Sequence, residues 1–287
     1  MNHRRDRVDL DGQTITYTDE GSGPPLVLLH GAPTTSYVYR HVICNLRHSF
    51  RCLAPDFPGW GDSPPLEHGD PTLPVLADIT EGFIRALDLS GVTMAVMDTA
   101  GSSGVCVVQR APDLFAGLVI ADTFVYPSED YPAVRRMLGL ATSRPFAAAN
   151  RRFNLLPRLV SRFGGRGRRL TFEERRAYDR AFATRAARDR IMVPLRDLRD
   201  NNAFLSAVAQ GIPDLRLPVL LLCGEHDPVR RIGVQSRLAQ TLPRATEVVI
   251  PGEAHFPHEG DPESVAGAIL GWATNCGIVR AMDGVAL

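Results

Sequence analysis

The chain has 287 residues, of which 44% are hydrophobic and 22% are charged, and its formal net charge is zero. This composition is ordinary for a globular protein and is sufficient for one large domain or a domain with an insertion. No stretch approaches the roughly 18 consecutive apolar residues of a membrane span, and a neutral chain without a recognition motif does not indicate nucleic-acid binding. The charged N-terminus lacks the apolar core of a signal peptide, so we expect a cytoplasmic protein.

Basic residues gather in one part of the chain. Residues 129–200 contain 18 arginines against 8 acidic residues, a surplus of 10, whereas the remainder contains 14 arginines against 24 acidic residues. This segment is therefore compositionally distinct. A solvated surface with internal ion pairs is the simpler interpretation, and attraction of an anionic substrate or an acidic carrier protein is the alternative.

The first half of the chain alternates strands and helices. Strands are predicted over residues 8–10 and 14–18, with a turn at residues 11 and 12. PLVLLHG predicts a strand buried on both faces, and a helix follows through residues 37–46. After a short strand and a Pro- and Gly-rich loop at RCLAPDFPGWGDS, we predict a helix over 74–88, a strand at VTMAVM, a helix over 100–110 and a strand at GLVIAD.

The second half begins with Arg-rich helical periodicity that runs to about residue 212. A strand at LPVLLLCG, a helix over 231–241, a strand at TEVVIPG and a helix over 261–275 follow. The alternation predicts an α/β fold with a mostly parallel eight-stranded sheet and helices on both faces. We predict a core domain of residues 1–123 and 213–287, with a helical cap of residues 124–212 inserted over the carboxyl edge of the sheet, where open α/β folds bind ligands.

Three polar residues follow three predicted strands. Asp98 follows VTMAVM, Asp227 lies in LLLCGEHDP, and His255 lies in VVIPGEAHF. The order nucleophile, acid and histidine, each in a loop after a different strand, is that of the α/β-hydrolase fold. The sequence therefore predicts Asp98 as the nucleophile, His255 as the base and Asp227 as the acid that orients the histidine.

Two other interpretations of these motifs are weaker. AGSSG at residues 100–104 places Ser102 as a rival nucleophile, but this requires the strand to continue through poor strand formers. HFPH suggests a metal pair of His255 and His258, yet the intervening proline disfavours the helix that would align them. We expect neither a metal nor a cofactor.

Five motifs together resemble the haloalkane dehalogenases, which are α/β-hydrolases with an aspartate nucleophile. The resemblance runs nearly end to end, and the HGAP element is shared with epoxide hydrolases. It implies the same three roles for Asp98, His255 and Asp227. Some family members take the acid from the end of the sixth strand, which here is predicted to be Thr123, so Asp227 is favoured. The motifs are HGAPTTSYVYR, APDFPGWGDS, VMDTAG, CGEHDPV and LTFEERRAYDRAFATRAARDR, whose cap pattern is matched by Tyr178, Phe182 and Arg188.

An aspartate nucleophile suits attack on an electrophilic saturated carbon. A carboxylate is ordinarily ionised at neutral pH, so it needs no base, and the product is an alkyl ester on Asp98. His255 then activates water to hydrolyse that ester. The backbone N–H groups of Ala32 and Thr99 are predicted to hold the oxyanion that forms.

The leaving group is where the chain departs from the family pattern. The resemblance implies a tryptophan directly after the nucleophile and commonly an asparagine in an HGN element, whereas this chain has Thr99 and Ala32. Losing two hydrogen bonds to a departing halide removes about 3–6 kcal/mol, or about 10²–10⁴ in rate. Alternatives are an epoxide, whose alkoxide is usually protonated by cap tyrosines, a non-hydrolytic cyclisation or elimination, and a ligand-binding protein on the same scaffold.

The remaining predictions concern the substrate and assembly. We expect a small-molecule substrate and a monomer or a homodimer. Three tyrosines, Tyr126, Tyr131 and Tyr178, lie in or beside the cap. Aromatic side chains are predicted to form the substrate-binding walls; they are Phe124, Tyr126, Tyr178, Phe182 and Phe256.

Overall fold

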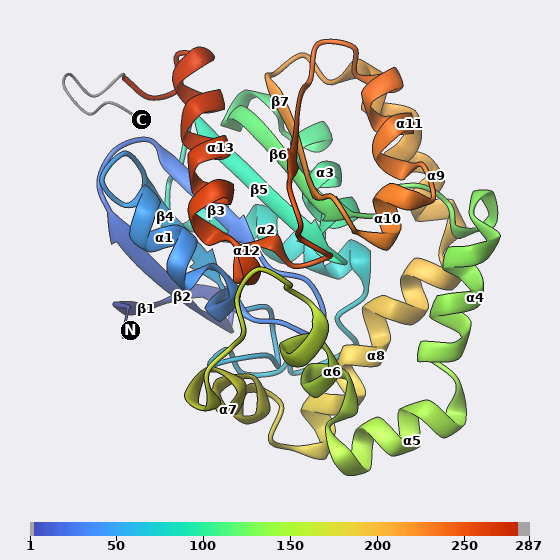
Figure 1. The fold of residues 1–287 in the computed structure, drawn as a ribbon. Helices are drawn as coiled ribbons and strands as arrows, with labels where there is room; N and C mark the ends of the chain where they lie inside the picture. Colours follow the sequence, from blue (N-terminus) through green and yellow to red (C-terminus); the bar gives the residue numbers. More distant parts are fainter. Residues whose placement is uncertain (1–2, 281–287) are drawn as a thin grey trace.

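One sheet of eight strands organises the computed structural model, which describes residues 3–280 (Figure 1). The strand order is β1-β2-β4-β3-β5-β6-β7-β8. The pairs β1–β2 and β2–β4 are antiparallel, and every other pair is parallel. The predicted mostly parallel sheet is therefore confirmed. The bounds are β1 Arg5–Leu10, β2 Gln13–Gly21, β3 Pro25–Leu29, β4 Arg51–Pro55, β5 Val92–Asp98, β6 Phe115–Thr123, β7 Val219–Gly224 and β8 Thr246–Ile250.

Six helices interrupt the alternation between β6 and β7. In Figure 1, α4 to α8 lie together beyond one end of the sheet. The last of the six, α9, packs against α3 of the sheet layer instead, and the Gln109 side chain donates a hydrogen bond to the Val208 carbonyl. The cap boundary at residue 212 stays a prediction. The helices are α4 Pro132–Ala141, α5 Arg144–Phe153, α6 Leu155–Phe163, α7 Phe172–Ala181, α8 Arg185–Asp200 and α9 Asn202–Gly211.

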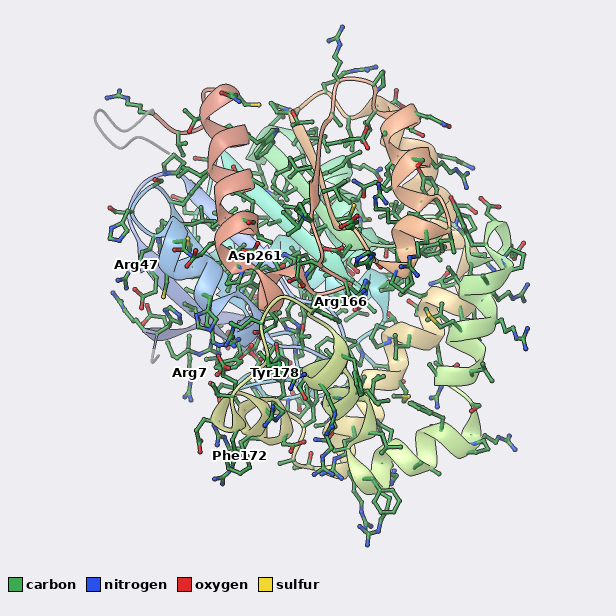
Figure 2. The ribbon with its side chains drawn as sticks, in the orientation of Figure 1. Arg7, Arg47, Arg166, Phe172, Tyr178 and Asp261 are labelled. Carbon is green, nitrogen blue, oxygen red and sulfur yellow. The ribbon has the colours of Figure 1, made fainter. Side chains whose placement is uncertain are left out.

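The short helix α7 is one of the inserted helices, and its two faces differ in exposure. Thr171 caps its first turn and forms a reciprocal pair of hydrogen bonds with Glu174. Figure 2 labels two of its aromatic residues: Phe172, which is 64% exposed, and Tyr178, which is buried. One face of α7 is therefore in solvent and the other is packed inward.

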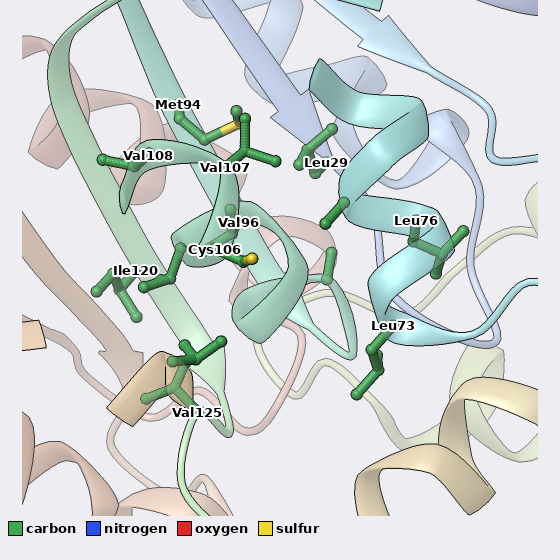
Figure 3. Close-up of a cluster of buried hydrophobic side chains, with 14 of the residues drawn as sticks. Leu29, Leu73, Leu76, Met94, Val96, Cys106, Val107, Val108, Ile120 and Val125 are labelled. Carbon is green, nitrogen blue, oxygen red and sulfur yellow. The ribbon is translucent and has the colours of Figure 1, made fainter. Parts of the chain in front are cut away.

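Helices cover both faces of the sheet, which explains the continuous apolar runs of its central strands. Along β5, Met94 and Val96 belong to one core, and Ala95 and Met97 belong to the other. Figure 3 shows part of the first core, where α2 and α3 pack on β5 and β6. The second core lies under α1 and α13, which pack against each other. The bounds are α1 Arg40–Leu46, α2 Leu73–Ala86, α3 Ala100–Arg110 and α13 Pro262–Asn275.

The helix predicted over residues 231–241 is two helices, α10 (Pro228–Arg231) and α11 (Val234–Thr241). Gly233 separates them with φ of 87°, a left-handed conformation that glycine adopts readily. A further short helix, α12 (Pro257–Gly260), precedes α13. Single turns of 3₁₀ helix cover Ser36–Tyr39, Pro112–Leu114, Ser128–Asp130 and Ile212–Asp214. None of the helices within residues 3–280 combines the length and apolar character needed to cross a bilayer.

Candidate active site

Asp98 is the last residue of β5 and stands at a sharp turn into α3. Its φ is 49°, so the backbone reverses within one residue. The turn needs glycine on both sides of it: a Cβ at Gly31 would lie 2.4 Å from the Asp98 Cβ, and a Cβ at Gly101 would lie 1.8 Å from the Thr123 Oγ1. The Thr123 hydroxyl donates a hydrogen bond to the Asp98 carbonyl at 2.5 Å. Small residues in VMDTAG therefore allow this turn to lift the carboxylate above the sheet edge.

The three predicted catalytic side chains lie in one line of hydrogen bonds. His255 Nε2 lies 2.8 Å from Asp98 Oδ2, and His255 Nδ1 lies 3.0 Å from Asp227 Oδ1. Asp227 also caps α10, where its Oδ1 accepts the Val229 N–H at 2.8 Å. The structure thus brings together residues that are separated by up to 157 positions in the chain. Ser102 is a buried residue of α3 and does not line the cavity at Asp98.

Opposing electrostatic effects act on the histidine and its acid. Burial lowers the pKa of His255, but the charges and hydrogen bonds of Asp227 and Asp98 outweigh it and raise that pKa well above its ordinary value. Burial raises the pKa of Asp227, but His255 and further hydrogen bonds outweigh it and leave that pKa lowered. The arrangement therefore favours an anionic Asp227 beside a protonated histidine.

Both backbone donors predicted for the oxyanion point at the nucleophile turn. The Thr99 N–H donates to Asp98 Oδ1 at 2.5 Å. The Ala32 N–H instead donates to the Thr99 hydroxyl oxygen at 2.9 Å. One predicted donor therefore contacts the Asp98 carboxylate, and the other contacts the hydroxyl of the residue that follows it.

Asp122 joins the site although our sequence analysis did not select it. It is the penultimate residue of β6, it is buried, and its φ is 42°. Ligating atoms of Asp122, Asp227 and His255 all lie within 4.8 Å of one another. The end of β6 is Thr123, as predicted, and its hydroxyl donates to the Asp98 carbonyl. The sequence GLVIADT contains the signal for Asp122, an acidic residue one position before the end of a buried strand.

The same three groups are close enough to hold a metal ion. Two of their atoms, His255 Nδ1 and Asp227 Oδ1, are already joined in a hydrogen bond at 3.0 Å. That bond accounts for their spacing without an ion.

A cavity of about 180 Å³ opens beside Asp98. Its polar floor consists of Asp98, Thr99, Asp122, Thr123, Asp227 and His255. Its walls are apolar and come from the inserted helices α4 and α8, from α10 and from the residue after β6. These wall residues are Phe124, Val134, Met137, Leu138, Leu195, Leu198, Pro228 and Val229. The space is large enough for a small apolar molecule.

One of the five aromatic residues predicted to bind substrate, Phe124, lines this cavity. The structure does not bring Tyr126, Tyr178, Phe182 or Phe256 to it, although all four are buried. The Tyr178 hydroxyl donates to Glu259 Oε1 at 2.5 Å, and its residue lines a different hollow of about 670 Å³ together with Phe256. Aliphatic side chains of α4 and α8 line the cavity instead of these four aromatic residues, because the two helices lie over the edge of the sheet.

The loop that carries His255 is bound to the inserted helices. The buried Glu253 accepts hydrogen bonds from the Arg166 and Gly167 N–H groups at 2.9 and 2.5 Å. The Phe256 N–H donates to the Gly164 carbonyl at 2.9 Å. Three hydrogen bonds therefore join the segment after α6 to the histidine loop.

Comparison with known proteins identifies the family. Residues 24–262 match the family described as alpha/beta hydrolase fold. Haloalkane dehalogenase 2 of Mycobacterium tuberculosis is 30% identical over 260 residues, which cover 89% of this chain and 90% of that protein. Cis-3-alkyl-4-alkyloxetan-2-one decarboxylase of Shewanella oneidensis is 26% identical over 234 residues, or 78% and 74% of the two chains.

The solved structures agree on the architecture. Haloalkane dehalogenase DbeA from Bradyrhizobium elkani matches with a TM-score of 0.84 at 23% identity, covering 96% of this chain and 98% of that one. At that identity the match shows the fold alone. The family match and the Mycobacterium relative carry the assignment further: the chain belongs to the α/β-hydrolase family and is a haloalkane dehalogenase-like hydrolase.

Proposed function

We propose that the protein hydrolyses a small apolar substrate through a covalent ester on Asp98. The observation that carries this proposal is the pair of hydrogen bonds on His255, at 2.8 Å to Asp98 and 3.0 Å to Asp227, at the floor of an apolar cavity. An aspartate that lines a cavity can attack a saturated carbon of the substrate. A histidine hydrogen-bonded to that aspartate can then activate water to hydrolyse the ester. Binding alone requires no such arrangement.

In the first step, an Asp98 oxygen bonds to the substrate carbon, and the bond to the leaving group breaks with its electron pair. In the second step, His255 takes a proton from water, and the hydroxide attacks the ester carbonyl carbon of Asp98. The Thr99 N–H, which already contacts Asp98 Oδ1, holds the oxyanion. Collapse releases the alcohol, which receives the proton from His255.

The ester itself prepares the histidine for the second step. In the resting site, the charges of Asp227 and Asp98 overcome burial and raise the pKa of His255. Esterification removes the charge of Asp98, so the pKa of His255 falls. The imidazole then releases its proton to solvent and is able to act as a base only after the nucleophile has reacted.

The leaving group has few hydrogen-bond donors in this cavity. Its lining contains no tryptophan, asparagine, tyrosine, lysine or arginine. The Thr99 hydroxyl accepts from Ala32 and keeps its own proton for a cavity acceptor. Departure of halide therefore depends on Thr99 and on the His255 imidazolium, which favours a good leaving group such as bromide over chloride. The cap tyrosines expected for an epoxide lie outside this lining.

The test uses 1-bromobutane and 1,2-epoxybutane, which share a four-carbon skeleton. One turnover in oxygen-18 water, followed by mass spectrometry of the peptide containing Asp98, is expected to show heavy oxygen in that carboxylate. His255→Gln should accumulate the alkyl-enzyme, and Asp98→Asn, as the matched control, should not. An unlabelled Asp98 peptide after product formation contradicts the ester mechanism.

A second candidate is opening of a strained lactone, which the cavity favours because the leaving group is a carboxylate that needs no separate donor site. The relative from Shewanella is named for an oxetanone substrate. Asp98 would bond to the ring carbon that carries the ring oxygen, and the carboxylate formed would remain on the substrate. Loss of carbon dioxide supplies the electron pair of a new carbon–carbon double bond, and Asp98 leaves.

The two candidates differ in their use of water. The lactone route consumes none, so neither Asp98 nor the product gains heavy oxygen, and His255→Gln retains turnover. Hydrolysis labels Asp98 in the first turnover and the alcohol product in later turnovers, and it requires His255. A cis-disubstituted oxetan-2-one with short alkyl groups, assayed beside 1-bromobutane, decides between them.

A further inference from the structure

A second buried carboxylate, that of Asp122, lies next to Asp227, the proposed acid of the site. Asp122 Oδ1 accepts the Gly224 N–H at 2.8 Å, which fixes the side chain. Its other oxygen, Oδ2, and the Oδ2 of Asp227 are both buried, and no N–H or O–H donor within residues 3–280 reaches either of them. The acid that orients His255 therefore has an acidic neighbour, and each has one oxygen without a donor.

Two ionised carboxylates in this position are unfavourable. Their ligating atoms lie within 4.8 Å of each other and of His255, in a site away from water. Like charges at such a distance raise the pKa of one partner strongly. A buried oxygen left without a donor is itself destabilising. A single proton held between the two carboxylates removes the repulsion and satisfies both oxygens.

We propose that Asp122 keeps its proton and donates it to Asp227 Oδ2, so that the acid behind His255 is a pair of carboxyl groups with one negative charge. The unequal surroundings assign the proton to Asp122. Asp227 Oδ1 has two partners, the Val229 N–H and His255 Nδ1, whereas the Asp122 carboxyl accepts one N–H. The anion belongs on the carboxyl that has more donors.

The pKa directions agree with this assignment. Burial and then the Asp227 charge raise the pKa of Asp122 well above its ordinary value. Burial raises the pKa of Asp227, but His255 and the Val229 N–H outweigh it and leave that pKa lowered. Other titratable groups face this cluster from neighbouring elements; they are Asp98 on β5, Tyr39 before α1, Cys223 on β7 and His258 on α12.

Asp122 is thus a positioning residue that acts through Asp227, and its role rests on the proposed function of Asp227 and His255. As a neutral acid it donates a hydrogen bond to Asp227 without adding a second negative charge. If it were ionised, it would stabilise the imidazolium further and delay the loss of the proton that ester hydrolysis requires. The neutral acid leaves the histidine easier to deprotonate.

The decisive variant is Asp122→Asn. Its amide N–H₂ donates to Asp227 as the protonated acid would, its carbonyl accepts the Gly224 N–H, and asparagine tolerates the left-handed backbone at this position. We expect no shift of the His255 pKa, followed by nitrogen-15 NMR of the imidazole. Asp227→Asn removes the charge and is expected to lower that pKa by about 1–3 units, which calibrates the measurement. A comparable fall in Asp122→Asn overturns the proposal.

Infrared difference spectra provide an independent readout. At pH 8, where ordinary carboxyl groups are ionised, the wild-type protein is expected to show one carbonyl band of a protonated acid that Asp122→Asn lacks. Absence of that band, or a stoichiometric metal in the protein as purified, contradicts a shared proton. Neither measurement needs turnover, so the proton assignment is decided even if no ester forms on Asp98.

Discussion

The hydroxyl oxygen of Thr99 accepts a hydrogen bond from the Ala32 N–H at 2.9 Å, directly beside Asp98, the proposed nucleophile. The backbone N–H of Ala32, predicted as an oxyanion donor, is therefore bound to the threonine, which also lines the cavity. This one contact links the residue that follows the nucleophile to both chemical steps of the proposed reaction.

Replacing Thr99 should affect those two steps differently. Thr99→Val removes a hydrogen bond to a departing anion, worth about 1.5–3 kcal/mol, so formation of the alkyl-enzyme should slow by about 10- to 150-fold. Hydrolysis should not slow, because the Ala32 N–H becomes available for the oxyanion. Rapid quenching with mass spectrometry measures both rates. Thr99→Ser, which keeps the hydroxyl, is the control, and equal rates in Thr99→Val and the wild type exclude a donor role.

Gly31 is expected to be indispensable for the nucleophile geometry. In Gly31→Ala the new Cβ would lie 2.4 Å from the Asp98 Cβ and 2.7 Å from its Oδ1, so the carboxylate must move. A displacement of about 1 Å reduces rates by about 100-fold. Gly82→Ala, where the nearest atom is 3.6 Å from the added Cβ, is the matched control. Circular dichroism checks the fold, and a Gly31→Ala enzyme with full activity contradicts the geometry.

The Tyr178 hydroxyl is expected to contribute to stability. It donates to Glu259, which also binds Arg40 through two hydrogen bonds at 2.5 and 2.8 Å, and all three side chains are buried. Tyr178→Phe removes one bond to a charged group, so unfolding free energy should fall by about 1–2 kcal/mol, since Arg40 remains as a partner. Tyr37→Phe tests a neighbouring ring, 5.8 Å from Tyr178, and should change little. Urea denaturation compares the variants.

His258 should make the protein sensitive to acid. Burial, and then the charge of His255, lower the pKa of His258 to about 3, and its ring packs edge-on against Tyr39. The unfolded chain, with a pKa near about 6.5, binds the proton more readily, so stability falls as the pH drops from 6.5 toward 3. His258→Phe removes this dependence, worth about 2 kcal/mol between pH 7 and pH 5. Denaturation curves at both pH values measure the unfolding free energy of each protein. The same pH dependence in the wild type and in His258→Phe refutes the prediction.

Local patterns made much of the fold predictable. Residues 100–110 form α3 as predicted, and β5 was recognisable because it is buried on both faces. The residues of the proposed triad were selected because each follows a strand end, and the structure places them in contact. These features depend on short-range pattern and on the known order of parallel strands.

Other features depend on how distant segments meet. Nothing within the sequence near Asp122 indicates that its carboxyl faces Asp227, which is more than a hundred positions away. Tyr178 is aromatic and lies in a cap motif, yet packing turns it toward Glu259 and away from the cavity. The apolar wall of α4 and α8 could not be distinguished from core packing, because both produce the same helical periodicity.

Asp98 is the last residue of β5 and Asp122 the penultimate residue of the adjacent strand β6, and both have left-handed backbone, with φ of 49° and 42°. Aspartate, asparagine and glycine occupy this region more readily than other residues, and β-branched side chains are strained there. Saturation libraries that aim to redesign the chemistry should therefore draw on these three amino acids at both sites and place their diversity on α4 and α8, where the backbone imposes no such filter.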